Sequence, residues 1–223
     1  MTSTKPASFL CLIITLFGEC CLAATSIDLR TEYESWNSGI NGNNTAILYG
    51  AGGTYNINRN WTIGGGLMMG SPDSDNNLDN LKRRDFDIAI GYRLRPKVAT
   101  YAGYRLVSIE YDNAIDNSRS FTDLTHGLGV GINLFHPVFA KTIAYGRLGL
   151  SGLLSTLDVN SVPKDHGFGV SVGFEIGMIY EILQRTTIGL ALKQQSATID
   201  YQDESDNWNH NYYRIGTSLS HYF

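Results

Sequence analysis

SIDLRTEYESW, residues 26–36, alternates charged and apolar side chains, and this alternation bears directly on the fold. The charged side chains are Asp28, Arg30, Glu32 and Glu34, and the apolar ones between them are Ile27, Leu29 and Tyr33. Because successive side chains of a β-strand point to opposite faces, such a strand has one charged face and one apolar face. In a soluble sandwich the charged face would meet water. In a barrel that crosses a membrane, the apolar face meets lipid and the charges lie inside.

The same two-residue period continues to the end of the chain. Phe168, Val170, Val172 and Phe174, for example, alternate with small or polar residues. This pattern predicts an all-β protein. The ten predicted strands cover residues 26–36, 45–57, 61–70, 85–94, 98–111, 124–135, 143–156, 167–181, 186–199 and 210–223. Eight strands are the alternative, because the glycine-rich pair 45–57 and 61–70 could be irregular.

Short and long connections alternate between the predicted strands. The shorter connections are residues 58–60, 95–97, 136–142 and 182–185, and the longer, polar ones are 37–44, 71–84, 112–123, 157–166 and 200–209. Bacterial outer-membrane barrels have this asymmetry, with tight periplasmic turns and longer external loops. A soluble sandwich has no reason to keep it along the whole chain. The connections therefore favour an antiparallel transmembrane β-barrel with five polar external loops.

The lengths of the apolar runs agree with this prediction. No segment after residue 24 has the run of about 18 apolar residues that a membrane helix needs. A tilted strand of about ten residues is long enough to cross the hydrocarbon layer. Its backbone groups find no water there, so the sheet has to close on itself.

The N-terminus has the layout of a secretory signal peptide. Lys5 precedes an apolar run at residues 9–17, and small residues follow at Ala23 and Ala24. We predict a signal peptide at residues 1–24 and one barrel domain at residues 25–223. Cleavage there removes Cys11, Cys20 and Cys21. Lipoprotein processing before Cys20 is disfavoured by Glu19. The mature chain is then without thiols, which excludes disulfides and cysteine-based sites.

Charge and residue spacing exclude further classes of function. The net charge of the full chain is −4, so there is no basic excess to suggest nucleic-acid binding. None of the five histidines has the spacing of a zinc site. We therefore expect no metal and no cofactor.

The charged face of the predicted strands decides between a plug and a pore. The inward charges are Asp28, Arg30, Glu32, Glu34, Asp87, Arg93, Arg105, Arg147, Glu175, Lys193 and Arg214. Six are basic and five acidic, so a mutually paired network is expected, since buried charges need partners. Eight strands enclose a space that side chains just fill, and ten are close to that limit. We predict a filled lumen, with a narrow pore for small solutes as the alternative.

The residue patterns support an enzyme site less strongly than they support a membrane barrel. His210 follows Asp203, Glu204 and Asp206. This group resembles the Asp/His cluster of omptin proteases, in which Asp73 and Asp75 would stand for a second acidic pair. Its spacing does not match well, and a solvated acidic loop is the simpler interpretation. Ser220 and His221 are neighbours in a strand and therefore face opposite sides. His126, His136 and His166 have no obvious partners. We expect no enzymatic activity.

Two features of the predicted loops could bind ligands at the surface. Asp73-Ser74-Asp75 with Asp79 suggests a weak calcium site, but it lacks the glycine and terminal Glu of an EF-hand loop. Lys82, Arg83 and Arg84 stand where the second long loop meets the outer leaflet. This is a suitable height for lipopolysaccharide phosphates, and an ordinary charged rim is the alternative.

The end of the chain, Tyr213-Arg214-Ile215-Gly216 through His221-Tyr222-Phe223, resembles the final strand of the small outer-membrane β-barrels of Gram-negative bacteria, the OmpA/OmpX-like and opacity-like proteins. Residues 26–30 also resemble the start of KdgM-type porins. The first resemblance implies outer-membrane localisation with lipid and lipopolysaccharide as neighbours. It also implies an assembly signal for the family's assembly machinery, carried by Tyr213, Ile215, Leu219 and Phe223.

Taken together, the sequence predicts a non-enzymatic integral outer-membrane barrel with a structural or surface-interaction role. A narrow porin comes second and an outer-membrane hydrolase third. The external partner is left open.

Overall fold

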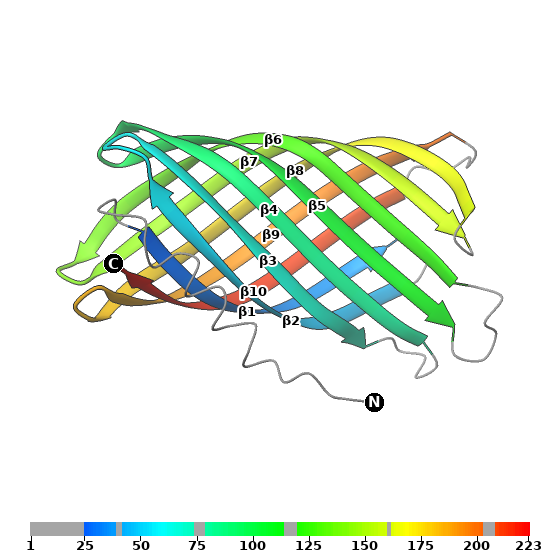
Figure 1. Ribbon diagram of the computed structural model, residues 1–223, viewed down its shortest axis with the longest axis horizontal. Coiled ribbons are helices and arrows are strands. Elements are labelled where there is room, and N and C mark those ends of the chain that lie inside the picture. Colours follow the sequence, from blue (N-terminus) through cyan, green and yellow to red (C-terminus); the bar gives the residue numbers. More distant parts are fainter. Residues whose placement is uncertain (1–24, 39–41, 74–78, 114–119, 160–161, 203–207) are drawn as a thin grey trace.

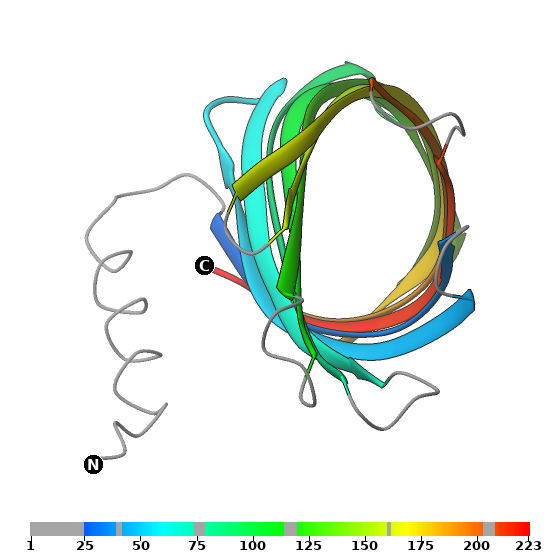
Figure 2. The same ribbon diagram turned by 90° about the vertical axis from the view of Figure 1, so that its right-hand side faces the viewer.

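The computed structural model describes residues 25–38, 42–73, 79–113, 120–159, 162–202 and 208–223. They form ten antiparallel strands in one closed barrel, in which each strand pairs with its sequence neighbours and β1 pairs with β10 (Figures 1 and 2). The strands are β1 (Thr25–Ser38), β2 (Gly42–Asn56), β3 (Trp61–Asp73), β4 (Asp79–Arg95), β5 (Val98–Asn113), β6 (Ser120–Phe139), β7 (Thr142–Val159), β8 (Val162–Leu183), β9 (Thr186–Tyr201) and β10 (Trp208–Tyr222). The prediction of ten strands is confirmed. The predicted signal peptide, residues 1–24, lies outside the described residues.

The register fixes the tilt of the strands. Following the paired residues once around the barrel from Ser26 leads back to β1 at Ser38. A closed sheet with such a stagger has strands inclined by roughly 35–45° to the barrel axis. Figure 1 shows this inclination along the whole barrel. The resulting wall has no free edge, which satisfies the backbone in lipid.

Four tight turns and the C-terminus lie at one end of the barrel (Figure 1). In the turn between β2 and β3, the Asn58 side chain accepts hydrogen bonds from the backbone N–H groups of Asn60 and Trp61, both at 2.9 Å. Arg185, between β8 and β9, has a positive φ of 67°. Tight turns of this kind face the periplasm in outer-membrane barrels.

The strands are longer at the opposite end than the sequence pattern predicts. β4 begins at Asp79 rather than residue 85, and β8 begins at Val162 rather than residue 167. As a result, only three residues separate β1 from β2 (39–41) and two separate β7 from β8 (160–161). The predicted long loops 37–44 and 157–166 are therefore wrong in extent. The hydrophobic alternation ends at the lipid boundary, but the pairing of backbone groups does not depend on it.

Polar side chains stabilise the strand extensions. On the outward face, Ser196 donates a hydrogen bond to Asn211 Oδ1 at 2.7 Å, and Thr198 donates one to Asn209 Oδ1 at 2.9 Å. Below them, the outward face is apolar on every strand, with Leu29, Leu128 and Leu190 among many exposed examples. The alternation of buried and exposed residues along β9 shows the two faces directly. Among the described residues there is no helix long and apolar enough to cross a membrane.

Candidate functional site

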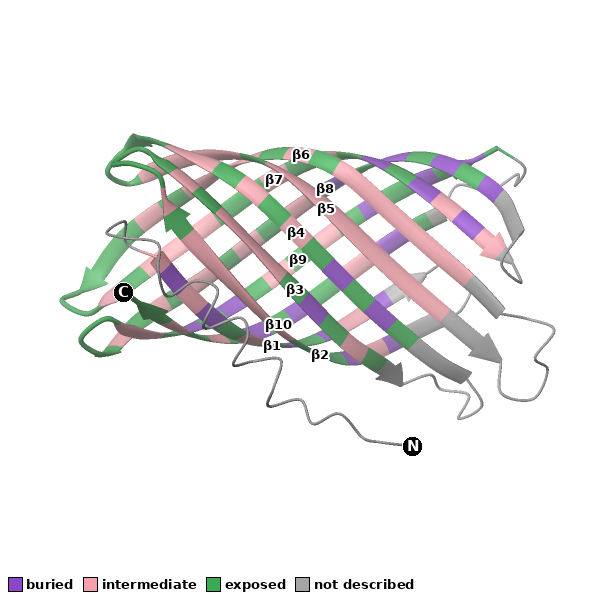
Figure 3. Ribbon diagram, in the orientation of Figure 1, coloured by how far each residue is buried: buried purple, intermediate pink, exposed green. Residues whose placement is uncertain are grey.

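The lumen is the candidate site, and its buried positions concentrate toward the end opposite the tight turns (Figure 3). Three acidic side chains are nearly inaccessible there: Glu32 and Glu34 on β1, and Asp85 on β4. Arg83 on β4 is 1% exposed and Arg214 on β10 is 9% exposed. These residues reach across the lumen from different parts of the wall. We call them, together with Arg105 and Lys193, the central charge cluster.

Arg83 lies at the centre of this cluster. Its Nη1 donates to Glu34 Oε1 at 2.5 Å, and its Nε donates to Asp85 Oδ1 at 2.8 Å. A second bond to Asp85, at 3.2 Å from Nη2, makes that pair bidentate. The guanidinium also packs against Trp36 and Tyr212, 5.6 Å and 5.1 Å from the ring centroids. The geometry allows cation–π contact with both rings.

Arg214 joins the three carboxylates into one network. It contacts Glu34 at 2.8 Å, Asp85 at 3.0 Å and Glu32 at 3.2 Å. Arg105 adds a bond to Asp85 at 2.7 Å, and Lys193 pairs with Glu32. The cluster therefore sets four cations against three carboxylates, so most of the buried charge is compensated. Such mutual pairing is what allows ionised groups to remain buried.

Small residues on β2 and β3 make room for these long side chains. A Cβ added at Gly52 would meet the Arg30 guanidinium at 2.8 Å, and one at Gly66 would meet it at 3.2 Å. Arg30 itself pairs with Asp28 on the same strand. Asp87 lies beside the same glycines, with its Oδ1 at 3.4 Å from the Cβ position of Gly66. Arg30, Asp28 and Asp87 thus form a second group below the central cluster.

The half of the lumen nearer the turns is more open to solvent. Arg147 is 48% exposed there and lies 3.7 Å from Glu175. Tyr145 donates a hydrogen bond to Glu175 at 2.8 Å, and Arg147 donates one to Asn133 at 2.9 Å. Arg93 is exposed near the turn that follows β4. The eleven predicted lumen charges are therefore divided among separate groups rather than joined in one network.

Aromatic rings cover glycines of the wall in this open half. The Tyr101 hydroxyl occupies the place where a Cβ of Gly149 would lie, and the next nearest atom, Tyr101 Cζ, is 3.6 Å away. The side chain of Arg147 lies over the same ring, at 5.2 Å. The Tyr101 side chain can therefore lie in this position only because residue 149 is a glycine.

We expect Gly149→Ala to lower the free energy of unfolding by about 1–3 kcal/mol, because the new methyl group overlaps the Tyr101 hydroxyl. In a Tyr101→Phe background, which lacks that oxygen, most of the loss should disappear. Gly152→Ala is the matched control, because nothing lies within 4 Å of its Cβ position. Urea unfolding in lipid vesicles compares the wild type with these four variants: Gly149→Ala, Tyr101→Phe, their combination and Gly152→Ala. An equal loss on Gly149→Ala in both backgrounds would contradict the contact.

The predicted lipopolysaccharide rim needs one correction. Arg83 is buried in the lumen, so its assignment to the surface is wrong. The reason is strand parity: β4 starts before residue 82, so Arg83 shares the inward face with Asp85 and Asp87. Lys82 is exposed, and Arg84 is 56% exposed, with its guanidinium 2.8 Å from Glu110.

Arg83 and Asp85 were not among the predicted lumen residues, although the sequence contains a signal for both. Asp87 was assigned to the inward face, and counting back in steps of two from Asp87 gives Asp85 and then Arg83. The assembly-signal residues Tyr213, Ile215, Leu219 and Phe223 all have exposed outward side chains. Their recognition by an assembly machinery stays a prediction.

The candidate enzyme residues are only partly within the described residues. The side chains of Asp73, Asp75, Asp79, Asp203, Glu204 and Asp206 fall outside them, as does the candidate calcium site. His210 is buried at the outer end of β10. Nearby strands contribute a hydrogen-bonded group in which Ser155 donates to Asp123 at 2.7 Å and contacts the Tyr201 hydroxyl at 2.9 Å. Within the described part of the chain, no three His, Cys, Asp or Glu side chains are placed to hold a metal ion.

Comparison with known proteins gives matches by structure alone. No protein-family model and no curated protein matches the sequence. The outer membrane protease OmpT from Escherichia coli aligns with 92% of this chain and 99% of its own, at 11% identity and a TM-score of 0.54. An outer membrane channel from Pseudomonas putida F1 aligns with 92% of this chain and 97% of its own, at 13% identity and a TM-score of 0.53. The fold is that of a Gram-negative outer-membrane β-barrel.

A third outer-membrane barrel has the same architecture. The β-domain of the Bordetella autotransporter BrkA aligns with 89% of this chain and 99% of its own, at 10% identity and a TM-score of 0.53. A protease, a channel and an autotransporter domain thus share the closed barrel, and the apolar outward surface of this chain suits the same membrane. Because one fold serves such different activities, function has to be argued from the lumen and the surfaces.

Proposed function

We propose that the chain is a non-enzymatic outer-membrane barrel whose lumen is closed by side chains of its own wall, with a structural or surface-interaction role. The packing of the outer half of the lumen carries this proposal. Glu34 and Leu48 are 0% exposed, and Arg83 is 1% exposed, although they belong to β1, β2 and β4. Ten strands enclose little more space than such side chains fill.

Apolar residues around the central charge cluster support the closure. Trp36, Leu48 and Met68 form one buried cluster, against which Ile109 and Tyr212 pack. A second cluster joins Leu157, Ile199 and Tyr201. Charged side chains that pair with each other, surrounded by packed apolar ones, leave few groups to line a water-filled path. This arrangement favours a plug over the narrow porin.

Planar-bilayer recording tests the closure. The purified wild-type barrel should give no steady conductance steps, because Arg83 reaches across from β4 to the paired rings of Trp36 and Tyr212 on β1 and β10. The double variant Trp36→Ala/Arg83→Ala removes this packing and should give measurable steps. Tyr101→Ala, which enlarges only the open half, is the control and should stay silent.

Steady steps from the wild-type protein would overturn the plug and favour the porin. The non-enzymatic part has its own test. A peptide- or lipid-cleaving activity of the purified protein that is lost in His210→Ala would contradict it.

The outer end of the barrel is the proposed interaction surface. Lys82 and Arg84 stand on its outward face, where lipopolysaccharide phosphates would meet them, although Glu110 already accepts from Arg84 at 2.8 Å. We extend the proposal to these two cations and not to Arg83.

A further inference from the structure

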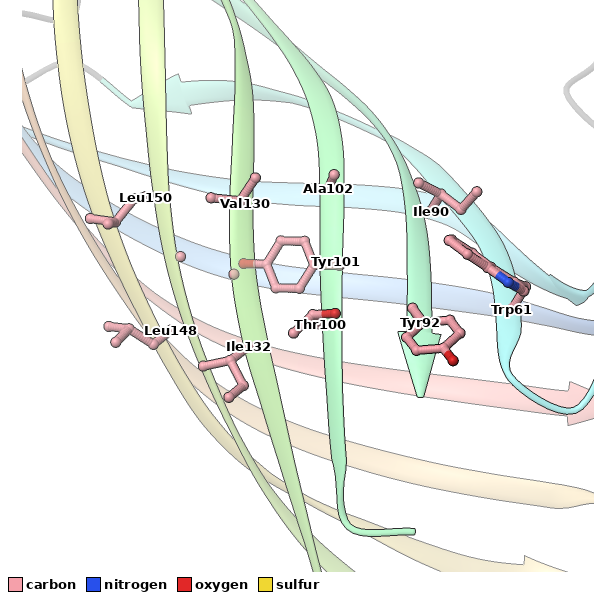
Figure 4. Close-up of a pocket in the computed structure, with 12 residues that line it drawn as sticks. Trp61, Ile90, Tyr92, Thr100, Tyr101, Ala102, Val130, Ile132, Leu148 and Leu150 are labelled. Atoms are coloured by element: carbon pink, nitrogen blue, oxygen red, sulfur yellow. The ribbon is translucent and has the colours of Figure 1, made fainter. Parts of the chain in front are cut away.

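An apolar groove runs along the lipid-facing side of β5, near the end with the tight turns (Figure 4). It has a volume of about 640 Å³. Its position follows from the size of neighbouring side chains. Ala102 and Thr100 face outward on β5 and are small, whereas their partners on both adjacent strands are large.

The register explains both banks of the groove. On one side, Ala102 pairs with Ile90 and Thr100 pairs with Tyr92. Trp61 extends this bank, with its ring 4.8 Å from that of Tyr92. On the other side, Ala102 pairs with Val130 and Thr100 pairs with Ile132. The lining continues past Val130 and Ile132 to Leu148 and Leu150 on β7 (Figure 4). The groove therefore spreads over the outward faces of β4 to β7, where rows of apolar side chains suit a hydrocarbon chain.

Cations stand at the turn end of this groove. Arg59 is two residues before Trp61, Arg95 is three residues after Tyr92, and Lys97 is three residues before Thr100, all exposed. Three residues of strand span about 10 Å. The two turns that carry these residues are held together, because Arg93 donates its backbone N–H to the Asn60 carbonyl at 2.8 Å. Short turns cannot project far from the membrane, so their charges lie near the headgroup phosphates.

We propose that this groove binds one anionic phospholipid of the inner leaflet, with an acyl chain between the two banks and the phosphate against Arg59, Arg95 and Lys97. Charge complementarity favours an anionic lipid over a zwitterionic one. Trp61 and Tyr92 line the groove at its turn end, next to the cations, at the interfacial height where aromatic side chains are favoured. The acyl chain lies on the outward face of the wall, while Tyr101, which also lines the groove, has its ring beside Arg147 on the lumen side.

Native mass spectrometry of the full barrel in detergent tests the site, with phosphatidylglycerol and phosphatidylcholine as the probes. The wild-type protein should retain one phosphatidylglycerol in preference to phosphatidylcholine. Arg95→Gln/Lys97→Gln should reduce that preference about tenfold, since each cation near an anionic surface contributes to binding. Ala102→Trp fills the floor of the groove and should reduce retention of both lipids.

The matched control is Lys141→Gln/Arg185→Asn, which removes two cations from other turns of the same rim. It should keep the preference of the wild-type protein. Equal loss in the control would show general attraction to the rim and overturn the site. Retention of phosphatidylglycerol by Ala102→Trp at the wild-type level would overturn the acyl-chain groove. If inorganic phosphate displaces the lipid while Ala102→Trp has no effect, the cations bind free anions and the lipid assignment is wrong.

Discussion

Asp85→Asn is expected to lower the free energy of unfolding by about 3–5 kcal/mol, because it leaves buried charges without their partner. Asp85 accepts from Arg83 at 2.8 Å, from Arg105 at 2.7 Å and from Arg214 at 3.0 Å. An amide of the same shape keeps the packing but removes the charge on which three guanidinium groups converge. Equilibrium unfolding by urea in phospholipid vesicles, followed by tryptophan fluorescence, measures the loss.

Glu110→Gln is the matched control for this change, since it also converts a carboxylate to an amide opposite an arginine. Its partner Arg84 is 56% exposed, so the expected loss is about 0–1 kcal/mol. The double variant Arg83→Met/Asp85→Asn also removes one of the cations that lost its carboxylate partner, and it should therefore recover part of the lost stability. Equal losses for Asp85→Asn and Glu110→Gln would show that the central charge cluster is solvated, and the closed lumen would lose its support.

The fold could be predicted because its signal is local and repeated. In SIDLRTEYESW the four charges share one face with Trp36, and Ile27, Leu29 and Tyr33 lie on the other. The structure buries Asp28, Glu32, Glu34 and Trp36 while exposing Leu29 and Tyr33. Closure then follows from the lack of water for edge backbone groups in lipid. The number of strands could be predicted by counting the turns that separate the apolar runs.

The ends of the strands could not be read from the same signal. Beyond the lipid boundary both faces of a strand carry polar residues, as Ser196 and Asn211 show for the outward face, so the alternation disappears while the pairing continues. Arg83 was assigned to the surface for this reason. A run such as Lys82-Arg83-Arg84 has the composition of a loop, and only strand parity separates its middle residue from the other two.

Most of the lumen charges could be predicted from the sequence, with Arg83 and Asp85 as exceptions, but their division into separate groups could not. Sequence gives the inward face of each strand, whereas the partners of Arg214 depend on the stagger of the closed barrel, which brings β1, β4 and β10 together at one height. The groove along β5 could not be predicted from the sequence either. Its shape depends on the register, which pairs Ala102 with Ile90 on one side and with Val130 on the other.

Ile176→Arg should lower the free energy of unfolding by about 2–4 kcal/mol, the cost of an arginine on the lipid face near the middle of the bilayer. Ile176 is 45% exposed on β8, within the outward apolar row from Phe168 to Ile182. Its partners on the adjacent strands are Gly146 and Leu192, which offer no acceptor to the new guanidinium. Urea unfolding in vesicles with phosphatidylcholine measures the effect, because that bilayer gives arginine no anionic headgroup.

His166→Arg places the same side chain on the same face of β8, at the outer end where the strand has left the apolar belt. His166 is exposed, and its Nδ1 lies 3.3 Å from the Thr156 hydroxyl oxygen. Its replacement should therefore cost about 0–1 kcal/mol. A larger loss of free energy of unfolding for Ile176→Arg than for His166→Arg would show that lipid covers the outward face at Ile176. If the two substitutions lower the free energy of unfolding equally, the outward face does not meet lipid. A barrel with apolar side chains outside and charged ones inside would then be the wrong description.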